Sequence, residues 1–162
     1  MFWKSKRFEQ WAPTGVGVAA LLLCAFFRLE IAEQFQPNKW NAGNLYNAVF
    51  NWAAIQSGFV FGIYGYVAAK RDGFVGEFAK GGSYNRFIGY TQRAYIGGFL
   101  LTACSLPLLV ATPNISRAGS WTFWLVVLWF SAFVWAFCSF LRVAFIFGLI
   151  AAIPDKKQRR AG

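Results

Sequence analysis

The side chains that could support catalysis or bind a metal are few in this chain. It has no histidine, and its three cysteines, Cys24, Cys104 and Cys138, lie in separate apolar runs without a CxxC spacing. Zinc sites and disulfide frameworks depend on closely spaced ligands or paired cysteines, so neither is expected. The missing histidine also excludes histidine-ligated haem and copper sites and a His-based catalytic triad.

The six acidic residues offer no better candidates for catalysis. Glu30 and Glu33 lie at the end of the first apolar run and just after it. Asp72, Glu77 and Asp155 lie among basic residues, and no acidic residue falls in the middle of an apolar run. Proton relays through membranes use carboxylates or histidines at that depth. We therefore predict a protein that is neither an enzyme nor a proton-coupled carrier, with no catalytic residue, no metal and no cofactor.

Small and polar residues are concentrated in one uncharged run, "NAVFNWAAIQSGFVFGIYGYVA", residues 47–68. On a helix with 100° per residue they form a stripe about 80° wide. The stripe contains Asn47, Asn51, Ala54, Gly58, Gly62 and Gly65. Because the hydrophobic effect does not drive helices together in lipid, small residues that let two backbones approach are a common contact.

This stripe supports two interpretations. The first is helix packing through Ala54, Gly58, Gly62 and Gly65, either within the bundle or in an oligomer. The second is a polar pathway or ligand pocket that Asn47 and Asn51 help to line. Gln56 lies in the same run but outside the stripe, so a neighbouring helix should provide its hydrogen-bond partner.

One basic residue, Arg142, lies within the last apolar run and shares a helix face with Ser131, Trp135 and Cys138. It could snorkel to the inner headgroups, because its long apolar stem can stay in lipid. It could instead lie within the hydrocarbon core, where an arginine is costly and usually binds an anion or a partner subunit. Gln56 and Arg142 therefore join the asparagines as candidate pathway or ligand-facing residues.

Four long apolar runs carry these residues, at 12–30, 45–69, 94–112 and 121–153. Each is close to or above the roughly 20 residues that cross a bilayer as a helix. We predict an all-α integral membrane protein, a helical bundle of four transmembrane helices that forms a single membrane domain over residues 1–162. The fourth run is overlong, about 50 Å as a helix, and must project, bend or tilt.

The basic residues between the runs predict the orientation. Twelve lysines and arginines lie in the N-terminus, the loop 70–93 and the tail 154–162, whereas three lie in the other two loops. The positive-inside rule therefore places both termini in the cytoplasm. This distribution also explains the net charge of +10 without nucleic-acid binding, and it predicts anionic lipid at the cytoplasmic face as a partner. The loop either lies on the inner headgroups or simply connects two helices.

These features predict a non-enzymatic protein of a bacterial inner (plasma) membrane. It would act through helix–helix assembly, as a homo-oligomer or as the membrane subunit of a larger complex with a scaffold or sensor role. The alternative is a channel or pore-forming effector lined by Asn47, Asn51 and Arg142. The size, topology and basic loops are also generically similar to those of immunity proteins against pore-forming toxins and of small membrane components of anti-phage or secretion systems.

Overall fold

The computed structural model describes residues 6–36, 39–69 and 82–151, and this part of the chain contains five helices and no strand. The helices are α1 (Lys6–Phe26), α2 (Arg28–Gln34), α3 (Ala42–Ala69), α5 (Gly82–Ala111) and α6 (Trp121–Ala151). The predicted all-α fold class is therefore confirmed for the described residues.

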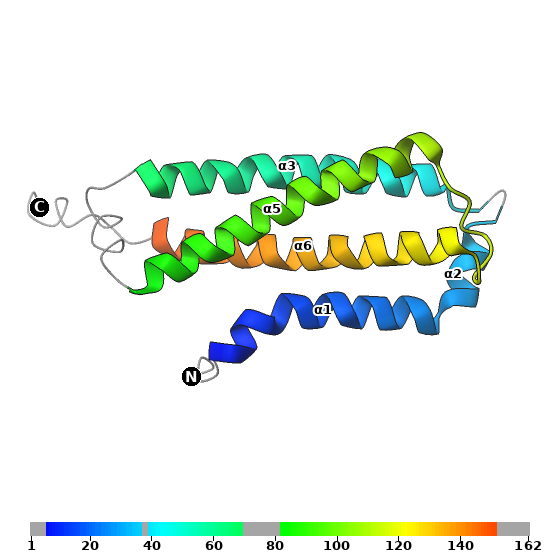
Figure 1. Ribbon diagram of the computed structural model, residues 1–162, viewed down its shortest axis with the longest axis horizontal. Helices are drawn as coiled ribbons and strands as arrows, with labels where there is room; N and C mark the ends of the chain where they lie inside the picture. Colours follow the sequence, from blue (N-terminus) through cyan, green and yellow to red (C-terminus); the bar gives the residue numbers. More distant parts are fainter. Residues whose placement is uncertain (1–5, 37–38, 70–81, 152–162) are drawn as a thin grey trace, which may run out of the picture.

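Four of the helices run lengthwise, and successive ones point in opposite directions (Figure 1). The most extensive packing joins α3 to α5, α1 to α6, and α5 to α6. Lys6, Ala69, Gly82 and Ala151 consequently lie at one end of the bundle, which we call the terminal end. The short helix α2 lies at the opposite end, which we call the α2 end.

Two helices, α5 from Tyr84 to Ala111 and α6, are each long and apolar enough to cross a membrane. A third span results if the bent pair Trp11–Phe26 and Arg28–Gln34 is taken as one. These helices are compatible with an integral membrane protein. Their number is two or three in the described residues, whereas four spans were predicted. The second predicted span, α3, has 28 residues without a charge, but its amides, glycines and tyrosines lower its hydropathy.

The start of α5 differs from the predicted boundary. The helix begins at Gly82 rather than at residue 94, so residues 82–93 of the predicted loop are helical. These extra turns bury Phe87 and Thr91, one turn apart on the same face. Phe87 packs in a core cluster with Val60 and Val67 of α3. Polar residues are interspersed through residues 82–93, so the buried face is hard to recognise in the sequence. Its packing on α3 stabilises this segment as a helix.

The first predicted run is bent rather than straight. A bend of 77° separates α1 from α2 at Phe27. In α2, Ala32 is buried while the charged residues are exposed, as expected for a short helix that covers the end of a bundle. Lys39 Nζ donates a 2.8 Å hydrogen bond to Glu33 Oε1, and this bond together with the lysine charge holds the pKa of the Glu33 carboxyl below its ordinary value.

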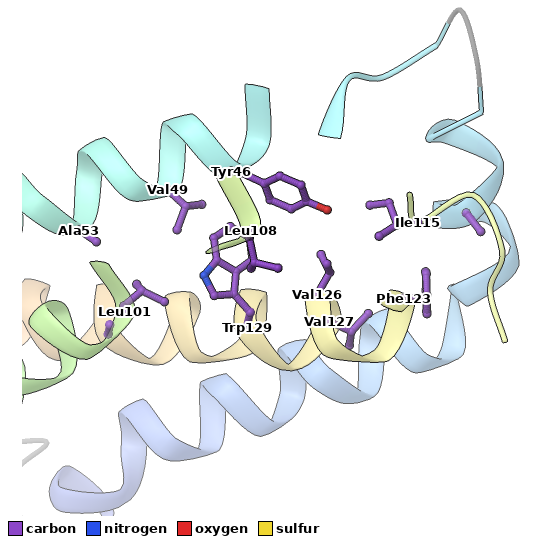
Figure 2. Packing of buried hydrophobic residues seen from close by; sticks show 12 residues of the cluster. Tyr46, Val49, Ala53, Leu101, Leu108, Ile115, Phe123, Val126, Val127 and Trp129 are labelled. Carbon is purple, nitrogen blue, oxygen red and sulfur yellow. The ribbon is translucent and has the colours of Figure 1, made fainter. Parts of the chain in front are cut away.

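The core at the α2 end combines aliphatic side chains with the aromatic rings of Tyr46, Phe123 and Trp129 (Figure 2). The rings of Tyr46 and Trp129 meet edge to face with centroids 5.5 Å apart. Their polar atoms are also satisfied: Trp129 Nε1 donates to Ser105 Oγ at 2.9 Å, and the Tyr46 hydroxyl donates to the Pro113 carbonyl at 3.2 Å. This cluster thus joins α3, α5 and α6 by packing and by hydrogen bonds.

Three glycines allow close approach between helices. A Cβ atom at Gly98 of α5 would overlap the Ser57 hydroxyl of α3. A Cβ at Gly97 would lie 2.6 Å from Trp135 Cζ3 of α6, and one at Gly17 of α1 would lie 3.0 Å from Trp135 Cβ. The indole of Trp135 therefore packs where α1, α5 and α6 meet, and a larger residue at these positions would push the helices apart.

Candidate functional site

The inward face of α3 holds the buried residues Tyr46, Val49, Ala53, Gln56, Ser57, Val60, Ile63 and Val67. Gln56 is 2% exposed, and its Nε2 donates a 3.2 Å hydrogen bond to the Ala136 carbonyl of α6. Its partner thus comes from a neighbouring helix, as the sequence predicted. Gln56 Oε1 has no hydrogen-bond partner among the described residues. This face packs α3 against its own bundle. None of the residues of the stripe lies on it.

The small-residue stripe lies on the opposite face of α3. Ala54, Gly58, Gly62 and Gly65 are all exposed. A Cβ built on any of the three glycines would meet no neighbouring atom within 4 Å. Of the two packing possibilities left open by the sequence, packing within the bundle is not seen in the described part of the chain. The reason is that α3 packs in the bundle through its buried valines and Ile63 together with Ala53 and Ser57. The glycines therefore lie on the outside.

The two asparagines of the stripe share this outer face. Asn47 and Asn51 are exposed, and Asn51 Nδ2 donates a 3.2 Å hydrogen bond to Asn47 Oδ1. Arg142 lies elsewhere, in a pocket between α1, α5 and α6, and Gln56 points inward. One copy of the chain therefore does not bring the four predicted pathway residues together. A common pathway through Asn47, Asn51 and Arg142 would require more than one copy.

The pocket around Arg142 is small and partly polar, with a volume of about 60 Å³. The guanidinium Cζ lies 3.5 Å from the centroid of the Tyr90 ring, a cation–π distance. Arg93, Thr14 and Ser139 also line this pocket, and none of its lining residues is acidic. Guanidinium and hydroxyl groups are donors that suit a phosphate or carboxylate. We call this cavity the arginine pocket.

Two larger cavities are apolar grooves. The α5–α6 groove, about 680 Å³, extends from Gly97 and Trp135 to Pro113 and Thr122. A second groove of about 600 Å³ lies near the α2 end and includes Trp40 in its wall. Trp135 lines both the α5–α6 groove and the arginine pocket. A cationic cavity and an apolar groove therefore adjoin at one indole ring.

Several contacts of this arrangement were not predicted from the sequence. The sequence pattern places Arg93 in a loop, whereas the structure places it within α5. Ser105 and Trp129 are 24 positions apart, and no spacing rule pairs them. The adjacent glycines Gly97 and Gly98 were a usable signal, since paired glycines in an apolar helix mark close backbone approach. Their partner helices follow only from the tertiary contacts.

Within the described ranges, no three His, Cys, Asp or Glu side chains come together as a possible metal site. The chain matches no family model, and no curated protein and no solved structure matches it.

Proposed function

We propose that this chain is an integral membrane protein that acts by assembling with further transmembrane helices through the exposed stripe of α3. The partner to which we commit is a second copy of the chain, which gives a homo-oligomer that can serve as a scaffold or as the membrane part of a larger complex. The observation that carries the proposal is the exposure of Ala54, Gly58, Gly62 and Gly65 on the side of α3 opposite its buried face.

The proposed topology has four spans, formed by α1, α3, α5 and α6, with both termini in the cytoplasm. Its support is that α1 and α3 lie alongside the two apolar spans over much of their length (Figure 1). The 28 residues of α3 include no charged side chain that would have to stay in water, and the helix is long enough to cross a bilayer. In the sequence, the basic N-terminus, residues 70–93 and the basic tail are continuous with the helix ends of the terminal end, which favours that end for the cytoplasmic face of a bacterial inner membrane.

The shape of the outer face of α3 suits a second helix. Ile55, 74% exposed, and Phe61, 56% exposed, lie on the two sides of the stripe. Between such ridges Gly58 and Gly62, a GxxxG pair, leave a shallow strip of backbone into which another helix can pack. In lipid this contact is driven by van der Waals packing, because lipid tails are as apolar as the side chains they would replace.

The exposed asparagines support the same partner. Asn51 is nine residues from the start of α3, which places its amide about 14 Å along the helix. An amide that faces hydrocarbon is costly unless it is hydrogen-bonded. The single bond between Asn47 and Asn51 leaves further donor and acceptor capacity on both amides. A neighbouring helix with the same two residues would provide matching groups.

Subunit number is the direct test of this proposal. Native mass spectrometry from micelles and energy transfer between labelled copies in liposomes would both report it. We expect the wild type to be oligomeric and Gly62→Leu to weaken association about tenfold or more, because a bulky side chain prevents backbone approach. Gly148→Leu is the matched control, since Gly148 of α6 is also exposed with no atom within 4 Å of its Cβ position.

Two outcomes would count against assembly. The first is a wild-type protein that stays monomeric in liposomes at all densities. The second is an equal subunit number for Gly62→Leu and Gly148→Leu. The channel hypothesis has its own readout on the same liposomes: an ion leak that Asn51→Leu abolishes and Gly148→Leu preserves would assign the stripe to a pore lining instead of a helix contact.

A further inference from the structure

We propose that the groove of about 600 Å³ near the α2 end, which we call the α2 groove, binds one phospholipid with an ethanolamine headgroup. The headgroup meets the Lys39–Glu33 ion pair, and one acyl chain follows the apolar lining toward Phe130. This proposal rests on the membrane placement given above, but it depends neither on the direction of insertion nor on the number of subunits.

The α2 groove is lined by four helices that do not close over it. Cys24 of α1, Ile31 of α2 and Leu45 of α3 contribute to its lining together with several apolar residues of α6. The extensive packing of α1 is on α6, whereas that of α3 is on α5. The groove therefore lies where α1 and α3 approach α6 from their separate packing partners. Its volume is within the range of pockets that hold a ligand.

The groove is polar at one end only. Its polar lining residues all fall within positions 39–44, and the rest of its lining is apolar. The polar end lies at the level of two exposed tryptophans, Trp40 and Trp121, as is common at a membrane interface. Phe130 is nine positions beyond Trp121, about 14 Å along α6. One leaflet of hydrocarbon is about 15 Å deep, so the groove extends from headgroup level through one leaflet.

An acyl chain suits the apolar part of the groove. Water would find few hydrogen-bond partners there, and an empty groove would forfeit the dispersion contacts of its lining. Beyond Phe130 the rings of Phe133 and Phe137 continue along α6, with successive centroids 5.6 Å and 6.1 Å apart. The end of a longer chain would therefore also meet apolar rings.

The polar end carries a cation and an anion. Lys39 Nζ donates to Glu33 Oε1 at 2.8 Å, and both side chains are exposed. The ammonium has three N–H donors and the carboxylate two oxygens, so this bond leaves capacity on each group. An exposed ion pair contributes little to stability. Both groups can therefore bind a ligand without loss of the fold.

An ethanolamine headgroup complements this ion pair. Its phosphate can accept from Lys39 and its primary ammonium can donate to Glu33, so that the four charges alternate in sign. Asn41 Oδ1 accepts the Gly43 N–H at 2.8 Å, which leaves the Asn41 amide NH₂ as a further donor for phosphate oxygens. A choline headgroup has no N–H donor, and a glycerol headgroup has no cation for Glu33. The ion pair therefore favours phosphatidylethanolamine over both other lipids.

Lipid retention in native mass spectrometry tests this site. Purified protein would be titrated with phosphatidylethanolamine, phosphatidylcholine and phosphatidylglycerol of identical acyl chains. We expect one phosphatidylethanolamine per chain to be retained in preference to the other two. Lys39→Gln and Glu33→Gln should each weaken this binding about five- to tenfold, the order expected for the loss of a charge-assisted hydrogen bond. Arg117→Gln and Glu30→Gln are the matched controls, because both residues are exposed near the α2 end and neither lines the groove.

A tail variant and a folding control complete the test. Cys24 is half-buried and lines the groove, so Cys24→Phe should reduce the retention of long-chain phosphatidylethanolamine more than that of a short-chain analogue. Ala19→Phe is its control, at an exposed position of α1 outside the groove. Circular dichroism would establish that each variant is folded. If Cys24→Phe does not fold, the Lys39 and Glu33 variants decide, since both residues are exposed.

Four results would overturn the lipid site: equal retention of phosphatidylethanolamine and phosphatidylcholine, tighter retention of phosphatidylglycerol, equal retention by Lys39→Gln and Arg117→Gln, or equal effects of Cys24→Phe and Ala19→Phe. The second would indicate a site for an anionic lipid. The same spectra give the subunit number, so the two proposals fail separately. Selective lipid on a monomer would refute assembly alone, and an oligomer without selective lipid would refute this site alone.

Discussion

Ser105 illustrates how a single polar side chain joins helices in this protein. Its hydroxyl donates to the Leu101 carbonyl at 2.6 Å and accepts the Trp129 Nε1 proton at 2.9 Å, and the residue is fully buried. Hydrogen bonds between helices in membranes contribute about 1 kcal/mol each. The bond also determines the orientation of the Trp129 ring, which packs on Tyr46.

At this scale we predict that Ser105→Ala lowers the free energy of unfolding by about 1 kcal/mol, because it leaves the buried Trp129 N–H without its acceptor. Trp129→Phe removes the donor together with part of the ring. The double variant should be less destabilised than the sum of the two single variants. Thermal or detergent-induced unfolding in bicelles measures all three. Strict additivity would contradict the described bond.

The α3 helix has two faces with different roles at the scale of an element. Its inward face packs most extensively on α5, where Ser57 lies against Gly98 so closely that a Cβ atom at Gly98 would overlap the Ser57 hydroxyl. Its outer face carries the glycines that the sequence pattern marks for packing. Helical periodicity identifies both faces of α3. A rule that assigns the face with the most small residues to the bundle would select the outer face, which is the wrong one.

The two kinds of glycine can be separated by substitution. Gly98→Val should destabilise the fold by about 1–3 kcal/mol, because the added side chain would overlap Ser57 and the helices would have to separate. Gly148→Val adds the same atoms at an exposed position of α6 with no neighbour within 4 Å, so it should change stability by only about 0.5 kcal/mol or less. Unfolding in bicelles is again the measurement, and equal effects at the two glycines would be inconsistent with the packing of α5 on α3.

The whole molecule combines an alternating bundle with a strong asymmetry of charge. In the sequence, the segments that carry most of the basic residues are continuous with the helix ends of the terminal end. The α2 end is closed by α2 and by the segment between α5 and α6 (Figure 1). The proposed orientation places the first end in the cytoplasm and the second outside.

This orientation predicts that two positions at opposite ends of the bundle differ in their accessibility to a reagent applied outside the cell. In a variant without the three native cysteines, Gly119→Cys near the α2 end should react with an impermeant maleimide on intact cells. Asn85→Cys near the terminal end should react only after permeabilisation, because both residues are exposed but face opposite sides of the membrane. Labelling of Asn85→Cys on intact cells would reverse the topology.

The amino-acid sequence by itself determined the helical class, the approximate position of each long helix and the need of Gln56 for a partner on another helix, because these depend on local hydropathy and helical period. The bend at Phe27, the early start of α5 and the outward direction of the stripe depend on which helices pack together. Only the tertiary structure decided that Arg93 and Arg142, 49 positions apart, line one pocket. Long-range packing places such residues side by side, and no periodicity within one helix contains that information.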